Sequence, residues 1–147
     1  MISHYAIEAL CEGQVFTFRE RISEASIDAF SSLSGDSNPL HMQSQFARLR
    51  GFENRVAHGF LLCGYLSRMV GMHLPGENAL LISANVKFSA PVYPNDDIIV
   101  SAIVDQISPA MKCIVLNATI AREGTEEILL KATLRIGFTE SKRLSDE

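Results

Sequence analysis

The residues best placed to do chemistry are an aspartate and a histidine five positions apart, Asp36 and His41. Gly35 favours a turn just before them, and Pro39 fixes the backbone between them. A carboxylate and an imidazole on such a segment can converge on one reacting atom, as in general acid–base catalysis. The same residues are compatible with an Asx-turn at Asp36 and a partly exposed histidine that does no chemistry. The two residue types alone leave both interpretations open.

The chain before this loop predicts a strand and then a helix. Val15–Ile22 favours a strand, and Ser23 is a good N-cap for a helix that Gly35 would end. Asn38 is pushed out of the helical region by the proline that follows it, which predicts a loop. A short helix is expected again over Ser44–Arg50. Three apolar residues recur at a spacing of three along the first helix: Ile27, Phe30 and Leu33.

A further predicted helix spans Ala57–Met72 and is apolar on nearly every side. A helix of this kind is normally buried. Gly71, and then Pro75 and Gly76, are expected to end it. Beyond this helix the apolar residues recur with a period of two, which indicates four long strands over residues 81–88, 98–105, 112–122 and 128–138.

The order of these elements predicts how they pack. Short connections between the strands favour antiparallel neighbours. A helix that is apolar all round must be enclosed, and the simplest enclosure is a sheet that curls around it. We therefore predict an α+β fold in a single domain over residues 1–140, with a flexible tail over residues 141–147. A single curled sheet leaves an edge uncovered, so we also expect a homodimer in which two sheets join.

The composition excludes several classes of protein. Of 147 residues, 47% are hydrophobic and 20% are charged, which excludes a disordered chain. Thirteen basic and 17 acidic residues give a net charge of -4, which excludes the basic footprint of a nucleic-acid-binding protein. No signal peptide or membrane-spanning stretch is visible, so we expect no membrane partner. Three distant cysteines, Cys11, Cys63 and Cys113, are typical of reduced thiols in a cytoplasmic protein.

A longer string around the acid–base pair carries a family resemblance. Residues 30–41 read Phe-Ser-Ser-Leu-Ser-Gly-Asp-Ser-Asn-Pro-Leu-His, and Ala47 follows six residues later. This string resembles the signature of hydratase 2, the family of (R)-specific enoyl-CoA hydratases and MaoC-like dehydratases. The resemblance continues through residues 56–62, 74–76 and 86–92, and extends from residue 14 to residue 138. It implies the hot-dog fold, an antiparallel sheet wrapped around a long buried helix, which agrees with the pattern described above.

The resemblance assigns chemical roles to three residues. It implies that Asp36 and His41 hold one water, remove one proton and return another while a trans-2-enoyl thioester is hydrated. It also implies that the backbone N–H of Gly59 stabilises the negative charge on the thioester oxygen. Gly59 lies near the start of the predicted helix, where N–H groups lack partners and the helix dipole is positive. A glycine needed only for tight packing is the alternative.

Other residues of these motifs are expected to support the site. Asn38 and Ser67 match family positions that orient the catalytic loop, and a purely structural role is equally open for both. His58 is expected to be an interior or capping histidine. Many relatives carry an aspartate two residues after the catalytic histidine, where this chain has Gln43, and this puts a supporting contact or an entry preference in doubt. His4 and His73 lack the ligand spacing of a metal site, so we expect no metal.

The resemblance implies a reversible hydro-lyase that interconverts (R)-3-hydroxyacyl and trans-2-enoyl thioesters of coenzyme A, with no cofactor beyond the thioester handle. A 3-hydroxyacyl-[acyl-carrier-protein] dehydratase of a specialised biosynthetic pathway is an alternative, because the phosphopantetheine arm is common to both handles. A hot-dog thioesterase and a non-catalytic acyl-binding subunit are two further alternatives. Four cations are candidates to bind a phosphate of the handle: Arg48, Arg50, Arg55 and Lys87.

Overall fold

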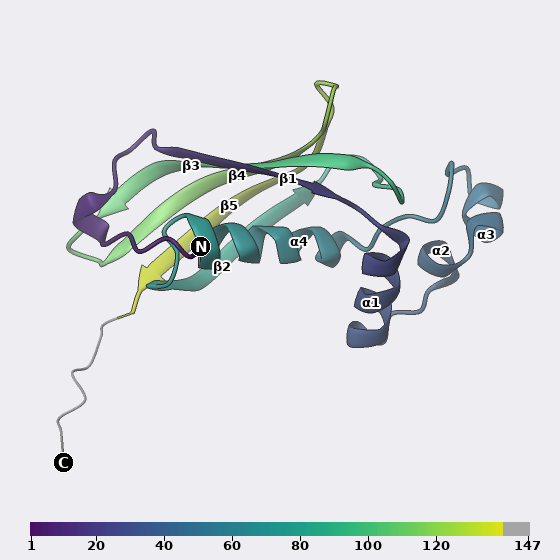
Figure 1. Cartoon of the computed structure of the whole chain (residues 1–147), viewed down its shortest axis with the longest axis horizontal. Helices are drawn as coiled ribbons and strands as arrows, with labels where there is room; N and C mark the ends of the chain where they lie inside the picture. The colour runs from purple at the N-terminus through teal and green to yellow at the C-terminus, as the bar shows by residue number, and fades with distance from the viewer. Residues whose placement is uncertain (140–147) are drawn as a thin grey trace, which may run out of the picture.

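The computed structural model describes residues 1–139, in which one five-stranded antiparallel sheet curls over a helix (Figure 1). Its strand order is β1-β3-β4-β5-β2. This confirms the predicted α+β fold, whereas the tail predicted over residues 141–147 lies outside the described residues. The elements are η1 (Ile7–Ala9), β1 (Val15–Arg21), α1 (Glu24–Ser34), α2 (Pro39–Met42), α3 (Ser44–Leu49), α4 (Gly59–Arg68), η2 (Met69–His73), β2 (Ala79–Phe88), β3 (Asp97–Ser108), β4 (Cys113–Arg122) and β5 (Ile128–Phe138).

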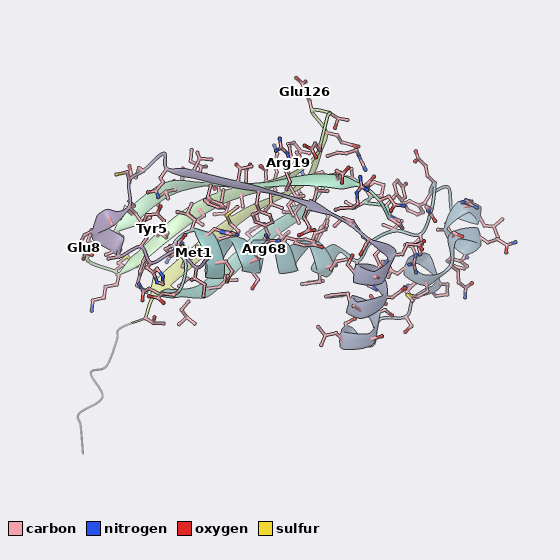
Figure 2. The ribbon with its side chains drawn as sticks, viewed as in Figure 1. Met1, Tyr5, Glu8, Arg19, Arg68 and Glu126 are labelled. Carbon is pink, nitrogen blue, oxygen red and sulfur yellow. The ribbon has the colours of Figure 1, made fainter. Side chains whose placement is uncertain are left out.

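The core lies between α4 and the sheet, where side chains from both fill the space (Figure 2). In α4, Leu62 and Leu66 are each 3% exposed, whereas Phe60 on the other side of the helix is 72% exposed. The sheet of one chain therefore encloses only one side of the helix that the sequence predicts to be buried. In β4 the alternation holds as predicted, because its four inward residues are all buried: Ile114, Leu116, Ala118 and Ile120.

The bounds of the central helix differ from the prediction at both ends. It begins at Gly59, with His58 as the N-cap residue, rather than at Ala57. Gly71 does not end it, because the chain continues through the wider turns of the π-helix η2 to His73. Within residues 1–139, no helix is both long enough and apolar enough to cross a bilayer.

The edge strand β2 departs from simple alternation. A β-bulge between Leu81 and Ser83 shifts its register against β5. Leu81 therefore lines a pocket together with Phe88. Simple alternation would place Ile82 on the same side of the strand as Phe88, but Ile82 lies against Gly137 of β5. The extra residue of a bulge reverses the alternation, and no residue type marks its position in the sequence.

At the far end of the central helix, a partly buried histidine is packed among aromatic rings. His73 stacks on Phe16 with ring centroids 4.4 Å apart and contacts Phe18 at 5.3 Å. Its Nε2 is buried and has no hydrogen-bond partner within residues 1–139. Burial lowers the pKa of His73 below its ordinary value of 6.5, and the positive charges of Arg68, labelled in Figure 2, and of the amino terminus lower it further.

We expect His73→Phe to stabilise the protein, and to do so more in mild acid than in mild base. As the pH falls below 6.5, the unfolded chain binds a proton that the folded ring resists, so the wild type loses stability there. A phenylalanine removes both this proton linkage and the buried unpartnered nitrogen. Thermal unfolding at about pH 5.5 and about pH 8 measures the difference. An equal gain in Tm at both pH values would contradict the linkage.

Candidate active site

The loop that carries the candidate acid–base pair begins at a well-defined helix end. The side chain of Ser23 accepts the N–H of Ser26, and the reciprocal bond completes a capping box at the start of α1. Gly35 ends α1 with a φ of 77°, a left-handed conformation that favours glycine. Both ends were predicted from the sequence. The chain therefore leaves α1 at a fixed point, directly before Asp36.

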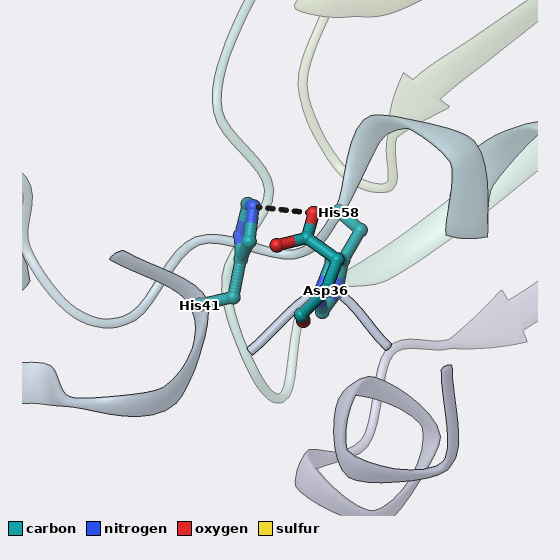
Figure 3. Close-up of side chains that lie close together, drawn as sticks. All are labelled: Asp36, His41 and His58. Atoms are coloured by element: carbon teal, nitrogen blue, oxygen red, sulfur yellow. Dashed lines mark hydrogen bonds and ion pairs between the residues drawn. The ribbon is translucent and has the colours of Figure 1, made fainter. Parts of the chain in front are cut away.

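Asp36 and His41 face each other across the next turn, as Figure 3 shows. Asp36 Oδ2 lies 3.7 Å from His41 Nε2. Asp36 Oδ1 accepts the N–H of Asn38 at 3.2 Å, which is the Asx-turn that the residue types also allowed. The turn thus uses one carboxylate oxygen and leaves the other directed at the imidazole. Asn38 in turn caps α2, because its Oδ1 accepts the N–H of Leu40 at 2.9 Å.

The tautomer of His41 follows from its second nitrogen. Nδ1 lies 2.7 Å from the carbonyl oxygen of Val56, and a carbonyl can only accept, so Nδ1 carries the hydrogen. In the neutral ring, Nε2 then presents a lone pair toward Asp36. The separation of 3.7 Å exceeds a direct hydrogen bond and suits a water bonded to both groups. The Asp36 side chain is 51% exposed and that of His41 is 16% exposed, so the pair lies between solvent and interior.

A third residue, His58, completes the cluster. Its side chain makes no capping hydrogen bond at the start of α4. It lies in the interior, which is one of the two places predicted, and the residue is only 2% exposed. Its Nε2 donates to the backbone carbonyl of Asp36 at 2.9 Å. Its ring stacks on that of His41, with centroids 3.9 Å apart and planes inclined by 29°. Asp36, His41 and His58 therefore form one connected group.

This cluster is poorly arranged to bind a metal ion. One potential ligand atom from each of Asp36, His41 and His58 lies within 4.8 Å of the others. Imidazole lone pairs lie in the ring plane, however, and two rings stacked face to face direct theirs side by side rather than to one point. The absence of a metal from the reaction stays a prediction.

Gly59 and His41 line the same cavity, of about 470 Å³, with mostly apolar walls. Gly59 is the first residue of α4, and its N–H has no hydrogen-bond partner within residues 1–139. The N-terminal N–H groups of a helix point outward and carry a partial positive charge. A methyl group on Gly59 would come within 2.9 Å of the ring of Phe88, which lines the same cavity. The glycine therefore provides a free donor and also makes room for a neighbouring ring.

Comparisons with known proteins show the family to which the chain belongs. Residues 10–122 match the family model of the MaoC-like domain. The (R)-specific enoyl-CoA hydratase of Rhodospirillum rubrum is 34% identical over 136 residues, which cover 92% of this chain and 94% of that protein. The (R)-specific enoyl-CoA hydratase of Aeromonas caviae is 30% identical over 117 residues, or 80% and 87% of the two chains.

The chain belongs to the MaoC-like domain family. A solved structure of the (R)-hydratase from A. caviae superposes on it with a TM-score of 0.85 at 26% identity, covering 90% of this chain and 99% of that chain. This likeness confirms the hot-dog fold that the sequence resemblance implied.

In this MaoC-like domain the departure at Gln43 leaves the arrangement of Asp36 and His41 intact. Gln43 lies between α2 and α3, is exposed, and makes no side-chain hydrogen bond within the described part of the chain. Asp36 and His41 keep the contacts described above without it. Any effect of the glutamine is therefore expected on how a ligand enters the cavity, and not on the positions of Asp36 and His41.

Ser67 lies away from the cluster. It follows Gly59 by two helical turns and lines a second, more apolar cavity of about 330 Å³. Phe60 and Phe88 line both cavities. Among residues 1–139, no hydrogen bond connects the Ser67 side chain to the loop that carries Asp36 and His41. Cys63 also lines this second cavity, and burial raises the pKa of its thiol, so the thiol stays neutral.

The cations proposed for phosphate binding differ in availability. Arg55 is buried, and its Nη1 donates to Asp28 of α1 at 2.7 Å, so it is already paired. This contact ties the segment before α4 to α1, and the sequence analysis missed it. Lys87 lies in a polar depression lined by β2, β4 and β5, whereas its neighbour Phe88 lines the candidate active site. The remaining exposed candidates are Arg48 and Arg50 of the α3 region.

Proposed function

We propose that this protein is an (R)-specific hydro-lyase that interconverts (R)-3-hydroxyacyl and trans-2-enoyl thioesters of coenzyme A. The observation that carries the proposal is the separation of 3.7 Å between Asp36 Oδ2 and His41 Nε2, beside a cavity with a free helix N–H at Gly59. The two relatives described above are named for this activity. Adding water to a double bond needs no redox group, so the proposed reaction requires no cofactor beyond the thioester handle.

In the proposed mechanism, Asp36 and His41 hold one water between them. One of the pair begins the hydration protonated and gives its proton to C2 of the enoyl group. The other removes a proton from the water, whose oxygen bonds to C3. The pair therefore ends with the same number of protons that it began with. A proton exchange between the two residues then restores the starting state.

The thioester oxygen becomes negative as water adds at C3, and we assign its stabilisation to Gly59. The N–H of Gly59 is preplaced at the positive end of α4 and needs no rearrangement during the reaction. A carbonyl can approach this N–H closely because the residue has no side chain. Bound in this way, the thioester would place its double bond beside His41, which lines the same cavity.

The second cavity offers a place for the acyl chain. It adjoins the first through Phe60 and Phe88 and is lined mainly by apolar residues of α4, β2 and β5. An acyl chain that leaves the thioester in this direction would bury apolar surface. Arg48 and Arg50, on the exposed α3 region, would then be the candidates to meet a phosphate of the handle.

Incubation with crotonyl-CoA tests the proposal directly. We expect loss of the enoyl-thioester absorbance, no release of free thiol, and formation of (R)-3-hydroxybutyryl-CoA. Thiol release would indicate a thioesterase instead. Activity on the crotonyl thioester of an acyl-carrier protein alone would indicate the carrier-protein dehydratase. No reaction with either handle would leave an acyl-binding subunit and overturn the proposal.

We also propose that the protein works as a homodimer in the cytoplasm. Among residues 1–139, the strand β2 pairs only with β5 and so presents a free edge. Five large apolar residues on or beside this strand are exposed in the single chain: Phe60, Leu80, Leu81, Ile82 and Phe88. An unpaired edge next to apolar surface is a strong site for association, and a second copy would cover both. Three free cysteines among the described residues support a reducing compartment.

Light scattering at micromolar concentration is expected to give the mass of two chains. Leu81→Lys should shift the protein toward single chains, because it places a charge on the apolar side of the edge strand. Asn85→Lys is the matched control, because Asn85 lies in the same strand but lines a polar depression. A single-chain mass for the wild type would contradict the proposed dimer.

A further inference from the structure

His58 takes no part in the mechanism proposed above, yet it is the most buried polar side chain of residues 1–139. We propose that His58 is a positioning residue, which sets the separation of Asp36 and His41 by holding the backbone of the first and the ring of the second. The inference rests on the proposed function, since it assumes that these two residues act together.

The hydrogen bond of His58 connects the two parts of the site. Its Nε2 donates to the carbonyl oxygen of Asp36 at 2.9 Å, across 22 residues of sequence. His58 is also the N-cap residue of α4 and directly precedes Gly59. This hydrogen bond therefore connects the Asp36 turn to the start of α4, where Gly59, the proposed oxyanion donor, lies. Any movement of Asp36 away from Gly59 would stretch this bond.

The ring of His58 also connects the two elements around the turn. It stacks on His41 of α2 with centroids 3.9 Å apart, and it contacts Phe30 of α1 at 4.9 Å. His41 is fixed at its other nitrogen by the carbonyl of Val56, at 2.7 Å. The stacked ring therefore limits the remaining freedom of the His41 ring, which is rotation about that bond.

The unsatisfied nitrogen of His58 argues against a role in packing alone. Its Nδ1 is buried and has no hydrogen-bond partner within residues 1–139. An unpartnered buried polar atom is destabilising. If only the ring contacts mattered, a phenylalanine would supply them without this loss. The histidine provides one thing that a phenylalanine lacks, which is the N–H bound to Asp36.

The structure assigns opposite tautomers to the two stacked rings. His41 carries its hydrogen on Nδ1 because it donates to Val56, and His58 carries its hydrogen on Nε2 because it donates to Asp36. Nitrogen NMR of the wild-type protein, labelled with ¹⁵N-histidine, distinguishes these forms. We expect the Nε2–H tautomer for His58 in the active pH range. The Nδ1–H tautomer, which has no hydrogen on Nε2, would overturn the proposal without any measurement of activity.

Two substitutions separate the hydrogen bond from the ring contact. His58→Phe keeps a ring and loses the donor, so we expect kcat to fall about 10- to 100-fold with KM nearly unchanged and Tm equal or higher. His58→Gln keeps an N–H near the position of Nε2, so we expect it to recover kcat to within about tenfold of the wild type. His73→Phe is the matched control, because it replaces another histidine that has a buried, unpartnered ring nitrogen, and its kcat should not change.

The outcomes separate this inference from the proposed function. If the wild type hydrates crotonyl-CoA and His58→Phe keeps kcat within about threefold, the positioning role is overturned and the function stands. If His58→Phe and His58→Gln lose equal activity with an equal fall in Tm, His58 serves the fold alone and the inference also fails. If the wild type has no hydratase activity, the proposed function fails, whereas the tautomer measurement still tests the hydrogen bond.

Discussion

Asp36→Asn is expected to lower the turnover number for crotonyl-CoA hydration by on the order of 10²–10⁴, the range usual for a general acid–base group. An asparagine keeps the shape of the side chain and can still accept the N–H of Asn38, so the turn should persist. The amide can neither accept a proton from water nor donate one to C2, however, so it can fill neither role of the pair. We therefore expect Tm to stay close to that of the wild type while the chemical step fails.

His41→Ala should produce a loss of similar size, and the double variant should be about as slow as the slower single variant. Two groups that act on one water are not additive, because removing either one already disables the step. Steady-state kinetics of the three variants measures this directly. Full additivity of the two losses, or wild-type turnover in Asp36→Asn, would contradict a shared water.

The chain offers a matched control for this pair. His4 and Glu77 also place an imidazole beside a carboxylate, with His4 Nδ1 and Glu77 Oε1 2.7 Å apart, but both are exposed on the surface. Neither lines the cavity that His41 and Gly59 share. His4→Ala should therefore leave turnover unchanged. A loss comparable to that of His41→Ala would indicate a general effect of removing histidines rather than chemistry at the site.

The parts of the site that could be predicted are those that depend on neighbouring residues in the sequence. The cap at Ser23 and the glycine end at Gly35 follow from local backbone preferences, and the structure has both. The loop with Asp36 and His41 then follows from a short string of residues. The strand faces of β4 are predictable for the same reason, since alternation is a local property.

The parts that could not be predicted depend on packing between distant segments. Arg55 pairs with Asp28 across 27 residues, and His58 reaches the Asp36 carbonyl across 22. No local pattern specifies either contact, because each arises only when α1 and the start of α4 come together. The bulge at Ile82 is similar, since the match of β2 to β5 decides where the extra residue goes. The unpredicted contacts are thus the ones that hold the predicted residues in place.

Gly59→Ala is expected to abolish most of the activity with little loss of stability. Alanine is a better helix former than glycine by about 1 kcal/mol, and Gly59 is not in a left-handed conformation, so α4 should form normally. The new methyl group would lie 2.9 Å from Cε1 of Phe88, at the far end of that side chain, so a rotation of the ring can relieve the contact. Both the methyl group and the displaced ring would then occupy the cavity where we place the thioester.

We expect Gly59→Ala to lower kcat by about 10²-fold or more, because loss of one oxyanion-hole contact has an effect of this size. Gly71→Ala is the control, since a methyl group there meets nothing within 4 Å. The variant Phe88→Ala, combined with Gly59→Ala, separates the two causes. If the double variant regains activity, crowding by Phe88 explains the loss, and Gly59 is a packing residue. If its activity stays far below that of Phe88→Ala alone, the methyl group itself keeps the thioester from the N–H, which is the result that an oxyanion donor at Gly59 requires.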